Sequence, residues 1–141
     1  MWNHSSSLEG YSILLQKMEQ DTVTPSGPPV KILDQPNEDG QLAEALALMR
    51  PDEGIYFLFF RSGCARFPTY DVKYATNSNI TEPCTRASKE LLKSGDMGLL
   101  APGSVSVGRD GKTWCLTFHT RVITDWGRSR DVYGKADFER H

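Results

Sequence analysis

The sequence predicts an α+β domain with a mixed or antiparallel sheet, a buried central strand over about 55–60, a C-terminal β hairpin over about 104–120 and two to three helices. Three observations lead to this prediction. Six consecutive apolar residues run from Ile55 to Phe60. An Asp-Gly pair at 110–111 separates two segments in which apolar and polar residues alternate. Three other segments repeat apolar residues at the spacing of a helix face.

The composition is that of a globular protein, with 38% hydrophobic and 24% charged residues in 141. We expect a single globular domain over 1–141, with flexible segments at 1–7 and about 127–141. A formal net charge of −2 disfavours nucleic-acid binding, and no apolar run has the roughly 20 residues that cross a bilayer. Since no cleavable signal peptide is recognisable, we expect a protein that is cytoplasmic or delivered to a target cell without such a signal.

The three helical patterns fall in the first two-thirds of the chain. The first helix is expected over about 8–20, the second over 41–49 before Pro51, and the third from about 83 to 93, where Pro83 lies just inside its start. A short strand over 30–33 separates the first two helices. The apolar stripes are Leu8, Tyr11, Leu15 and Met18 in the first, Leu42, Ala45, Leu46 and Met49 in the second, and Ala87, Leu91 and Leu92 in the third.

The apolar run at 55–60 indicates a strand that is buried on both faces, because it is rich in aromatic residues and bounded by Gly54 and Ser62-Gly63. The hairpin strand that follows the Asp-Gly turn alternates, so its side chains divide between two faces. One face carries Trp114, Leu116 and Phe118, and the other carries Cys115, Thr117 and His119.

The cysteines do not form a recognisable framework. Cys64, Cys84 and Cys115 are odd in number and include no CxxC pair, which argues against a set of disulfides. The three histidines and three cysteines show no metal-ligand spacing. We therefore expect neither a metal site nor a cofactor.

Cys64 is the candidate nucleophile. It follows Ser62-Gly63 at the end of the buried strand, where Gly63 permits a sharp turn that leaves backbone N–H groups open to hold an oxyanion. A thiol needs a base to become a useful nucleophile, and His119 is the one histidine inside an expected strand. A free cysteine after a core strand is also commonly a small buried hydrophobe, so both interpretations of Cys64 stay open.

The segment Phe59-Phe60-Arg61-Ser62-Gly63-Cys64 resembles the apolar strand ending in Ser-Gly-Cys of the cytotoxic necrotizing factor-type glutamine deamidases. Phe118-His119-Thr120 is similar to the later strand of that family, which carries its catalytic histidine. The resemblance implies a Cys–His amidohydrolase, a bacterial effector or toxin domain that deamidates a glutamine of a protein substrate. Cys64 would then be the nucleophile, His119 the general base and Gly63 part of the oxyanion hole.

A second resemblance gives an alternative without catalysis. The strand ending in Ser-Gly-Cys, followed later by Leu100-Ala101-Pro102-Gly103-Ser104 and an Asp-Gly hairpin, is similar to thioredoxin-like domains. The residue three positions after Cys64 is Phe67 and not a second cysteine, so thiol exchange by a CxxC motif is excluded. This resemblance implies a protein-binding domain of thioredoxin-like or other α+β fold.

Overall fold

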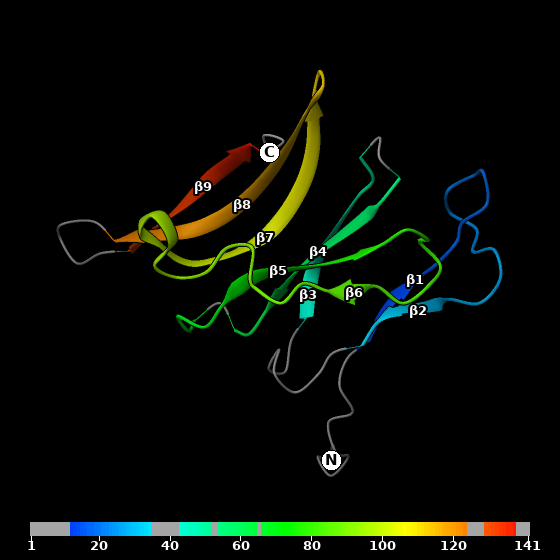
Figure 1. Ribbon diagram of the computed structural model, residues 1–141, viewed down its shortest axis with the longest axis horizontal. Coiled ribbons are helices and arrows are strands. Elements are labelled where there is room, and N and C mark those ends of the chain that lie inside the picture. The colour runs from blue at the N-terminus through cyan, green and yellow to red at the C-terminus, as the bar shows by residue number, and fades with distance from the viewer. Residues whose placement is uncertain (1–11, 35–42, 52–53, 65, 124–128, 138–141) are drawn as a thin grey trace, which may run out of the picture.

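The computed structural model describes residues 12–34, 43–51, 54–64, 66–123 and 129–137, and this part of the chain is built almost wholly of β-strands (Figure 1). It contains no α-helix; the only helical element among the described residues is a 3₁₀ turn at Asp96–Gly98. The predicted α+β class is therefore wrong, and the described part of the chain is an all-β structure.

Nine strands in the described residues form three antiparallel sheets, each with its strands in chain order. β1 (Ile13–Leu15) and β2 (Val30–Leu33) form a hairpin. The four-stranded sheet holds β3 (Ala43–Met49), β4 (Tyr56–Ser62), β5 (Asp71–Asn77) and β6 (Thr85–Arg86). The three-stranded sheet holds β7 (Leu99–Asp110), β8 (Thr113–Ile123) and β9 (Ser129–Asp137).

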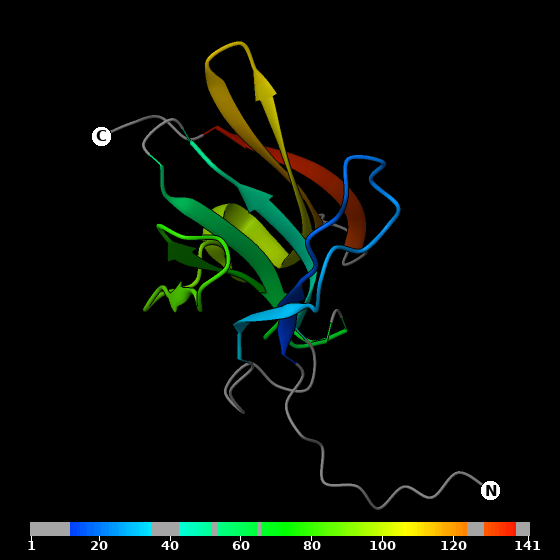
Figure 2. The same ribbon diagram turned by 90° about the vertical axis from the view of Figure 1, so that its right-hand side faces the viewer.

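The sheets follow one another as separate layers. The four-stranded sheet lies between the other two, with the β1–β2 hairpin on one side and the three-stranded sheet on the other (Figure 1). The tip of the β7–β8 hairpin extends beyond the rest of the layers (Figure 2). β3 and β7, the first strands of consecutive sheets, also contact each other. Small antiparallel sheets that succeed one another in this way are the arrangement of blades in a β-propeller.

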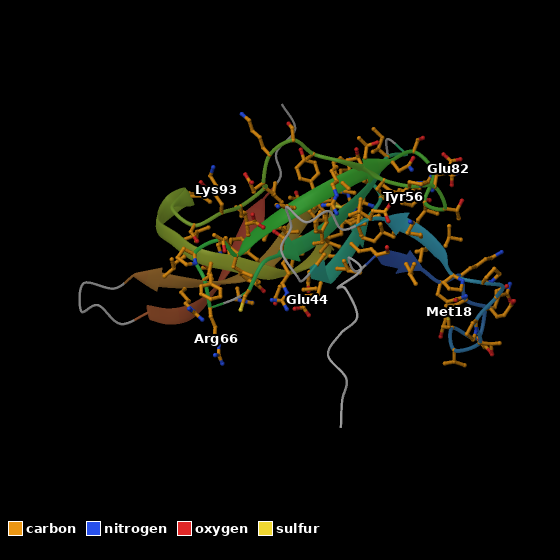
Figure 3. All side chains as sticks on the ribbon, turned by 90° about the horizontal axis from the view of Figure 1, so that it is seen from below. Met18, Glu44, Tyr56, Arg66, Glu82 and Lys93 are labelled. Atoms are coloured by element: carbon orange, nitrogen blue, oxygen red, sulfur yellow. The ribbon has the colours of Figure 1, made fainter. Side chains whose placement is uncertain are left out.

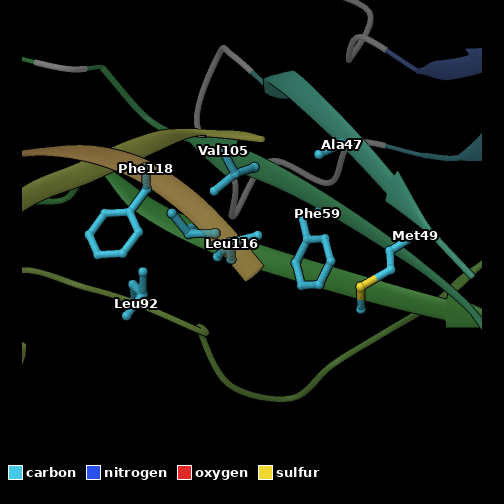
Figure 4. Close-up of a cluster of buried hydrophobic side chains, with 8 residues drawn as sticks. Ala47, Met49, Phe59, Leu92, Val105, Leu116 and Phe118 are labelled. Carbon is cyan, nitrogen blue, oxygen red and sulfur yellow. The ribbon is translucent and has the colours of Figure 1, made fainter. Parts of the chain in front are cut away.

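β4 supplies apolar side chains to both layers that cover it. Phe59 belongs to the cluster between the two larger sheets, where it packs with Met49, Leu116 and Phe118 (Figure 4). Phe60 and Leu58 point the other way, into a second cluster that includes Ile13, Ile32, Leu33 and Ala75 from the hairpin and β5. The prediction of a strand over 55–60 that is buried on both faces is confirmed.

Two other strand predictions are also confirmed. β2 occupies 30–33, and the hairpin turns at Gly111, whose φ of +57° suits a two-residue turn between antiparallel strands. Leu116 and Phe118 lie in the core cluster and Trp114 packs against it, so the predicted apolar face of β8 is correct.

The helix predicted over 41–49 is wrong. Its alanine and leucine residues favour a helix, but nine residues are too few to form a stable helix without tertiary support. β4 offers this segment backbone partners on both sides of a register shift, at Ala43 and Glu44 before it and from Ala47↔Phe59 to Met49↔Phe57 after it. Ala47 and Met49, two residues apart, then enter the core as in a strand.

The other two helices are replaced in the same way. Ile13–Leu15, inside the helix predicted over about 8–20, pairs with β2. In the third segment the backbone of Leu91 and Leu92 is bonded to Val72 on β5, at 2.8 Å from Leu91 N to Val72 O and 2.8 Å from Val72 N to Leu92 O. Extended chain at these positions buries Leu92 against β5 without a helix.

The ends of the chain complete the description. Residues 1–7 lie outside the described part, and β9 occupies 129–137, within the segment of about 127–141 that was expected to be flexible. None of the described elements is a helix long and apolar enough to span a membrane.

Replacing Phe60 by Ala should lower the free energy of unfolding by about 3–5 kcal/mol, because a fully buried aromatic side chain is lost and a cavity is left in the cluster against the hairpin. Phe67, whose side chain is 59% exposed, is the matched control, and Phe67→Ala should change the stability by less than about 0.5 kcal/mol. Denaturant unfolding measures both. Equal effects of the two substitutions would contradict the burial of β4 on both faces.

Candidate functional site

A polar cluster stands at one end of the apolar interface between the two larger sheets. It consists of Glu44 on β3, Arg61 on β4, Tyr70 just before β5 and His119 on β8, and we call it the Glu44 cluster. Arg61 follows Phe59 by two residues and therefore lies on the same face of β4. The cluster thus begins where the apolar packing of Phe59 ends.

Arg61 is the centre of the cluster. Its Nη2 forms an ion pair with Glu44 Oε1, and its Nη1 donates a hydrogen bond to Tyr70 Oη. The guanidinium also lies over the Tyr70 ring, with Cζ 4.9 Å from the ring centroid, a cation–π arrangement. β3 and β4 bring Glu44 and Arg61 together directly, because the two are cross-strand partners.

Tyr70 connects this pair to the second sheet. Its side chain is fully buried, and its ring stacks on that of His119 with centroids 6.1 Å apart and planes 24° apart. Gly103 of β7 is the cross-strand partner of His119. A Cβ atom at Gly103 would lie 2.0 Å from Tyr70 Cε1, so the absence of a side chain there makes room for the ring.

The backbone is irregular around the cluster. Register shifts interrupt β3 between Glu44 and Ala47 and β7 on both sides of Gly103. Ala45, Ala101 and Ser104 have positive φ values of 54°, 51° and 50°, which are uncommon outside glycine. Bulges of this kind re-aim side chains and are frequent beside active sites, and strained backbone is typical of functional sites.

Hydrogen bonds support the strained segment of β7. Ser94 Oγ accepts a hydrogen bond from Ala101 N at 2.9 Å and donates one to Pro68 O at 2.6 Å. The side chain of Thr120 is buried. Its Oγ1 accepts a hydrogen bond from Leu100 N at 3.2 Å and donates one to Leu100 O at 3.1 Å. The loop before Tyr70 and the start of β7 are therefore tied together.

Glu44 and Arg61 differ in their access to solvent. The side chain of Glu44 is 47% exposed and that of Arg61 only 16%, so the carboxylate faces the solvent and the guanidinium lies behind it. Arg61 Nε is buried and has no hydrogen-bond partner in the described part of the chain. An unsatisfied buried donor is rare, and it calls for a functional or structural reason.

The chemistry available to this arrangement is that of a carboxyl group. Glu44 can accept a hydrogen bond or a proton from a bound hydroxyl or water, while Arg61 and Tyr70 hold it in one orientation. A polar group held on strands next to a packed core is suited to precise positioning.

Comparison with solved structures identifies proteins of the same fold. The chain superimposes on a thermostable family-43 glycoside hydrolase with a TM-score of 0.74 and 21% identity, over 92% of this chain and 45% of that one. An exo-1,5-α-L-arabinanase from a bovine ruminal metagenomic library gives 0.71 and 19%, over 90% and 46%. A xylan β-1,4-xylosidase from Bacillus halodurans C-125 gives 0.69 and 19%, over 95% and 26%.

The likeness is one of fold. This chain spans less than half the length of these three structures and corresponds to part of a propeller-type domain. No protein-family model and no curated protein sequence matches it.

These findings overturn the deamidase interpretation. The resemblance to cytotoxic necrotizing factor-type deamidases rested on short segments around Cys64 and His119, whereas the whole described chain follows the fold of glycoside hydrolases. The predicted Cys–His amidohydrolase is therefore wrong. The thioredoxin-like alternative is not supported either, because the helices that it needs are strands or extended chain.

The structure separates the residues that the sequence analysis had grouped. Cys64 is half-buried in the turn after β4, where its carbonyl accepts a hydrogen bond from Phe67 N at 2.9 Å. Gly63 has a φ of +77° and lies against Thr69. His119 stacks on Tyr70, and within the described residues no hydrogen bond joins it to Cys64. The catalytic roles of Cys64, Gly63 and His119 were implied by the resemblance to the deamidase family. They stay predictions, and the observed fold does not support that family.

Glu44, Arg61 and Tyr70 were missed. Glu44 fell within the expected helix of 41–49, and Tyr70 within an irregular stretch. One signal was present: Arg61 places a charged group directly after six apolar residues of a buried strand. Charged side chains are almost never fully buried unless they are paired, so a partner for Arg61 could have been sought.

Replacing Gly103 by Ala should destabilise the protein by about 1–3 kcal/mol, because the new methyl group would overlap the Tyr70 ring in a packed region. Gly108→Ala is the matched control on the same strand, where nothing lies within 4 Å of a Cβ atom. Urea unfolding measures both substitutions. In a Tyr70→Ala background the effect of Gly103→Ala should disappear, and an undiminished effect there would contradict the steric explanation.

The alkylation rate of Cys84 should lag behind that of an unhindered thiol at pH 8. Burial raises the pKa of the Cys84 thiol above its ordinary value, so less of the reactive thiolate is present at a given pH. Iodoacetamide labelling followed by mass spectrometry, repeated from pH 7 to 10, measures this rate. In urea the lag should vanish; a Cys84 that reacts equally fast folded and unfolded would contradict it.

Proposed function

We propose that this chain belongs to a glycoside hydrolase that acts on saccharides of arabinose or xylose, and that Glu44 is one of its catalytic carboxyl groups. The observation that carries the proposal is the Glu44 cluster: an exposed carboxylate, fixed by Arg61 and Tyr70, at a strained bulge on β3. The substrate class follows from the names of proteins with the same fold, which include arabinanases, a xylanase and a xylosidase.

The chemistry of glycoside hydrolysis fits this cluster. Most glycosidases use two carboxyl groups, one on each side of the glycosidic bond, and the reaction passes through an oxocarbenium-like transition state. Glu44 has the properties that one of these groups requires. It is accessible to a substrate, and its orientation is fixed by a neighbour on β4.

The cluster contains one carboxyl group among the described residues. Asp71, the nearest acidic residue in sequence to Tyr70, accepts a hydrogen bond from Ser62 Oγ at 2.5 Å. Ser62 and Asp71 are cross-strand partners and adjoin Arg61 and Tyr70 in the chain, so their side chains point to the opposite face of the sheet. The second carboxyl group of the reaction would therefore come from outside the Glu44 cluster.

Removal of the carboxylate should abolish hydrolysis without unfolding the protein. We expect Glu44→Gln to lower kcat on 4-nitrophenyl α-L-arabinofuranoside or β-D-xylopyranoside by on the order of 10²–10⁴-fold, the contribution of one general acid or base. Release of 4-nitrophenol measures the rate, and linear arabinan and xylan are tested in parallel by their reducing ends.

Glu82→Gln is the matched control. Glu82 is exposed in the turn before β6 and far from Glu44 (Figure 3), and this substitution should leave kcat unchanged. The proposal fails if the wild-type chain cleaves none of the four substrates. It also fails if Glu44→Gln cleaves them as fast as the wild type.

A further inference from the structure

We infer that Arg61 is a positioning residue for Glu44, and that it makes the orientation of Glu44 depend on the packing of the second sheet. This inference rests on the proposed function, since it assigns a role in the reaction that Glu44 would perform. Glu44 lies on β3 and has its ion pair with Arg61, and Arg61 is held in turn by Tyr70, which is held by β7 and β8.

The position of the Arg61 guanidinium is fixed independently of Glu44. Its guanidinium is bonded to Tyr70 Oη and lies over the Tyr70 ring, and its side chain is 16% exposed. A planar guanidinium held at two points presents its remaining N–H groups in a fixed direction. Glu44 must therefore orient toward Arg61, and not the reverse.

Tyr70 is itself held in place by the three-stranded sheet. Its ring is fully buried, fills the space left by Gly103 and stacks on His119. A displacement of Tyr70 would move its Oη, which is the atom that Arg61 binds. The contacts thus run from β7 and β8 through Tyr70 and Arg61 to the carboxylate on β3.

Arg61 also supplies the positive charge next to Glu44. The charged or titratable groups of the cluster are Arg61 on β4, Tyr70 before β5 and His119 on β8, besides Glu44 itself. Arg61 is the one that touches Glu44 and carries a charge at every pH of interest. Loss of Arg61 should therefore remove both the opposite charge and the planar group that orient the Glu44 carboxylate.

The experiment compares the wild-type chain with Arg61→Gln, Arg61→Lys and Arg66→Gln. Arg66 is an exposed arginine in the turn after β4, outside the cluster (Figure 3), and serves as the matched control. The chemical shift of the Glu44 side-chain carboxyl ¹³C, identified by its absence in Glu44→Gln, is recorded by NMR at one pH in each variant. The values of kcat and KM are measured on the nitrophenyl pentosides.

In Arg61→Gln we expect the chemical shift of the Glu44 carboxyl carbon to change and kcat to fall by on the order of 10²-fold, as misplacement of a catalytic group does. KM should change little, because Arg61 lies behind Glu44. Arg61→Lys should recover kcat only in part, since lysine keeps the charge and loses the planar fork. Arg66→Gln should match the wild type in all three measurements.

The outcomes separate this inference from the proposed function. If the wild type cleaves no pentoside, the proposed function is overturned and the inference falls with it. If the wild type is active and Arg61→Gln keeps its full kcat, the inference alone is overturned. An unchanged chemical shift of the Glu44 carboxyl carbon in Arg61→Gln overturns it as well, because Arg61 would then exert no influence on the carboxyl group.

Discussion

The burial of β4 on both faces is the constraint on which the rest of the structure depends. Phe59 on one face and Phe60 on the other are almost completely excluded from solvent, so a layer must cover each side. The three-stranded sheet covers the first and the β1–β2 hairpin the second. Each buried aromatic side chain contributes a few kcal/mol to the free energy of unfolding. Loss of either layer would therefore expose apolar side chains and destabilise the protein. The next residue outward on the Phe59 face is Arg61, and its place is fixed by the same packing.

The polar end of the interface depends on features that cost stability locally. Positive φ at a non-glycine residue costs on the order of 1–3 kcal/mol, and Ala45, Ala101 and Ser104 all have it. Such strain persists only where the surroundings compensate for it. At Ala101 the compensation is visible, because the strained N–H is bonded to Ser94 Oγ. The strain and its support both occur beside the Glu44 cluster, which favours a functional explanation of the irregular backbone.

The sequence was informative where a pattern has one structural meaning. The apolar run at 55–60 and the Asp-Gly hairpin predicted β4 and β7–β8 correctly, because burial and turn geometry are decided locally. The alanine and leucine residues of 43–49 predicted a helix, and the pairing of this segment with β4 overrode that preference. The Glu44 cluster could not be predicted, because its four residues come from separate strands and loops and share no motif. Cys64 and His119 looked like a pair only because Cys64 followed one recognisable strand and His119 lay inside another.

The position of Glu44 also explains how a site of this chemistry can arise without a motif. β3 is the outermost strand of its sheet on one side and contacts β7, the first strand of the next sheet. In a propeller the first strands of successive sheets surround a common centre, so a side chain on one of them faces side chains on the others. Two carboxyl groups that flank a glycosidic bond lie roughly 5–9.5 Å apart, a span that such a centre can provide between two sheets. The proposed chemistry therefore requires of β3 a single carboxyl group, held in direction by Arg61, and its counterpart would come from another sheet.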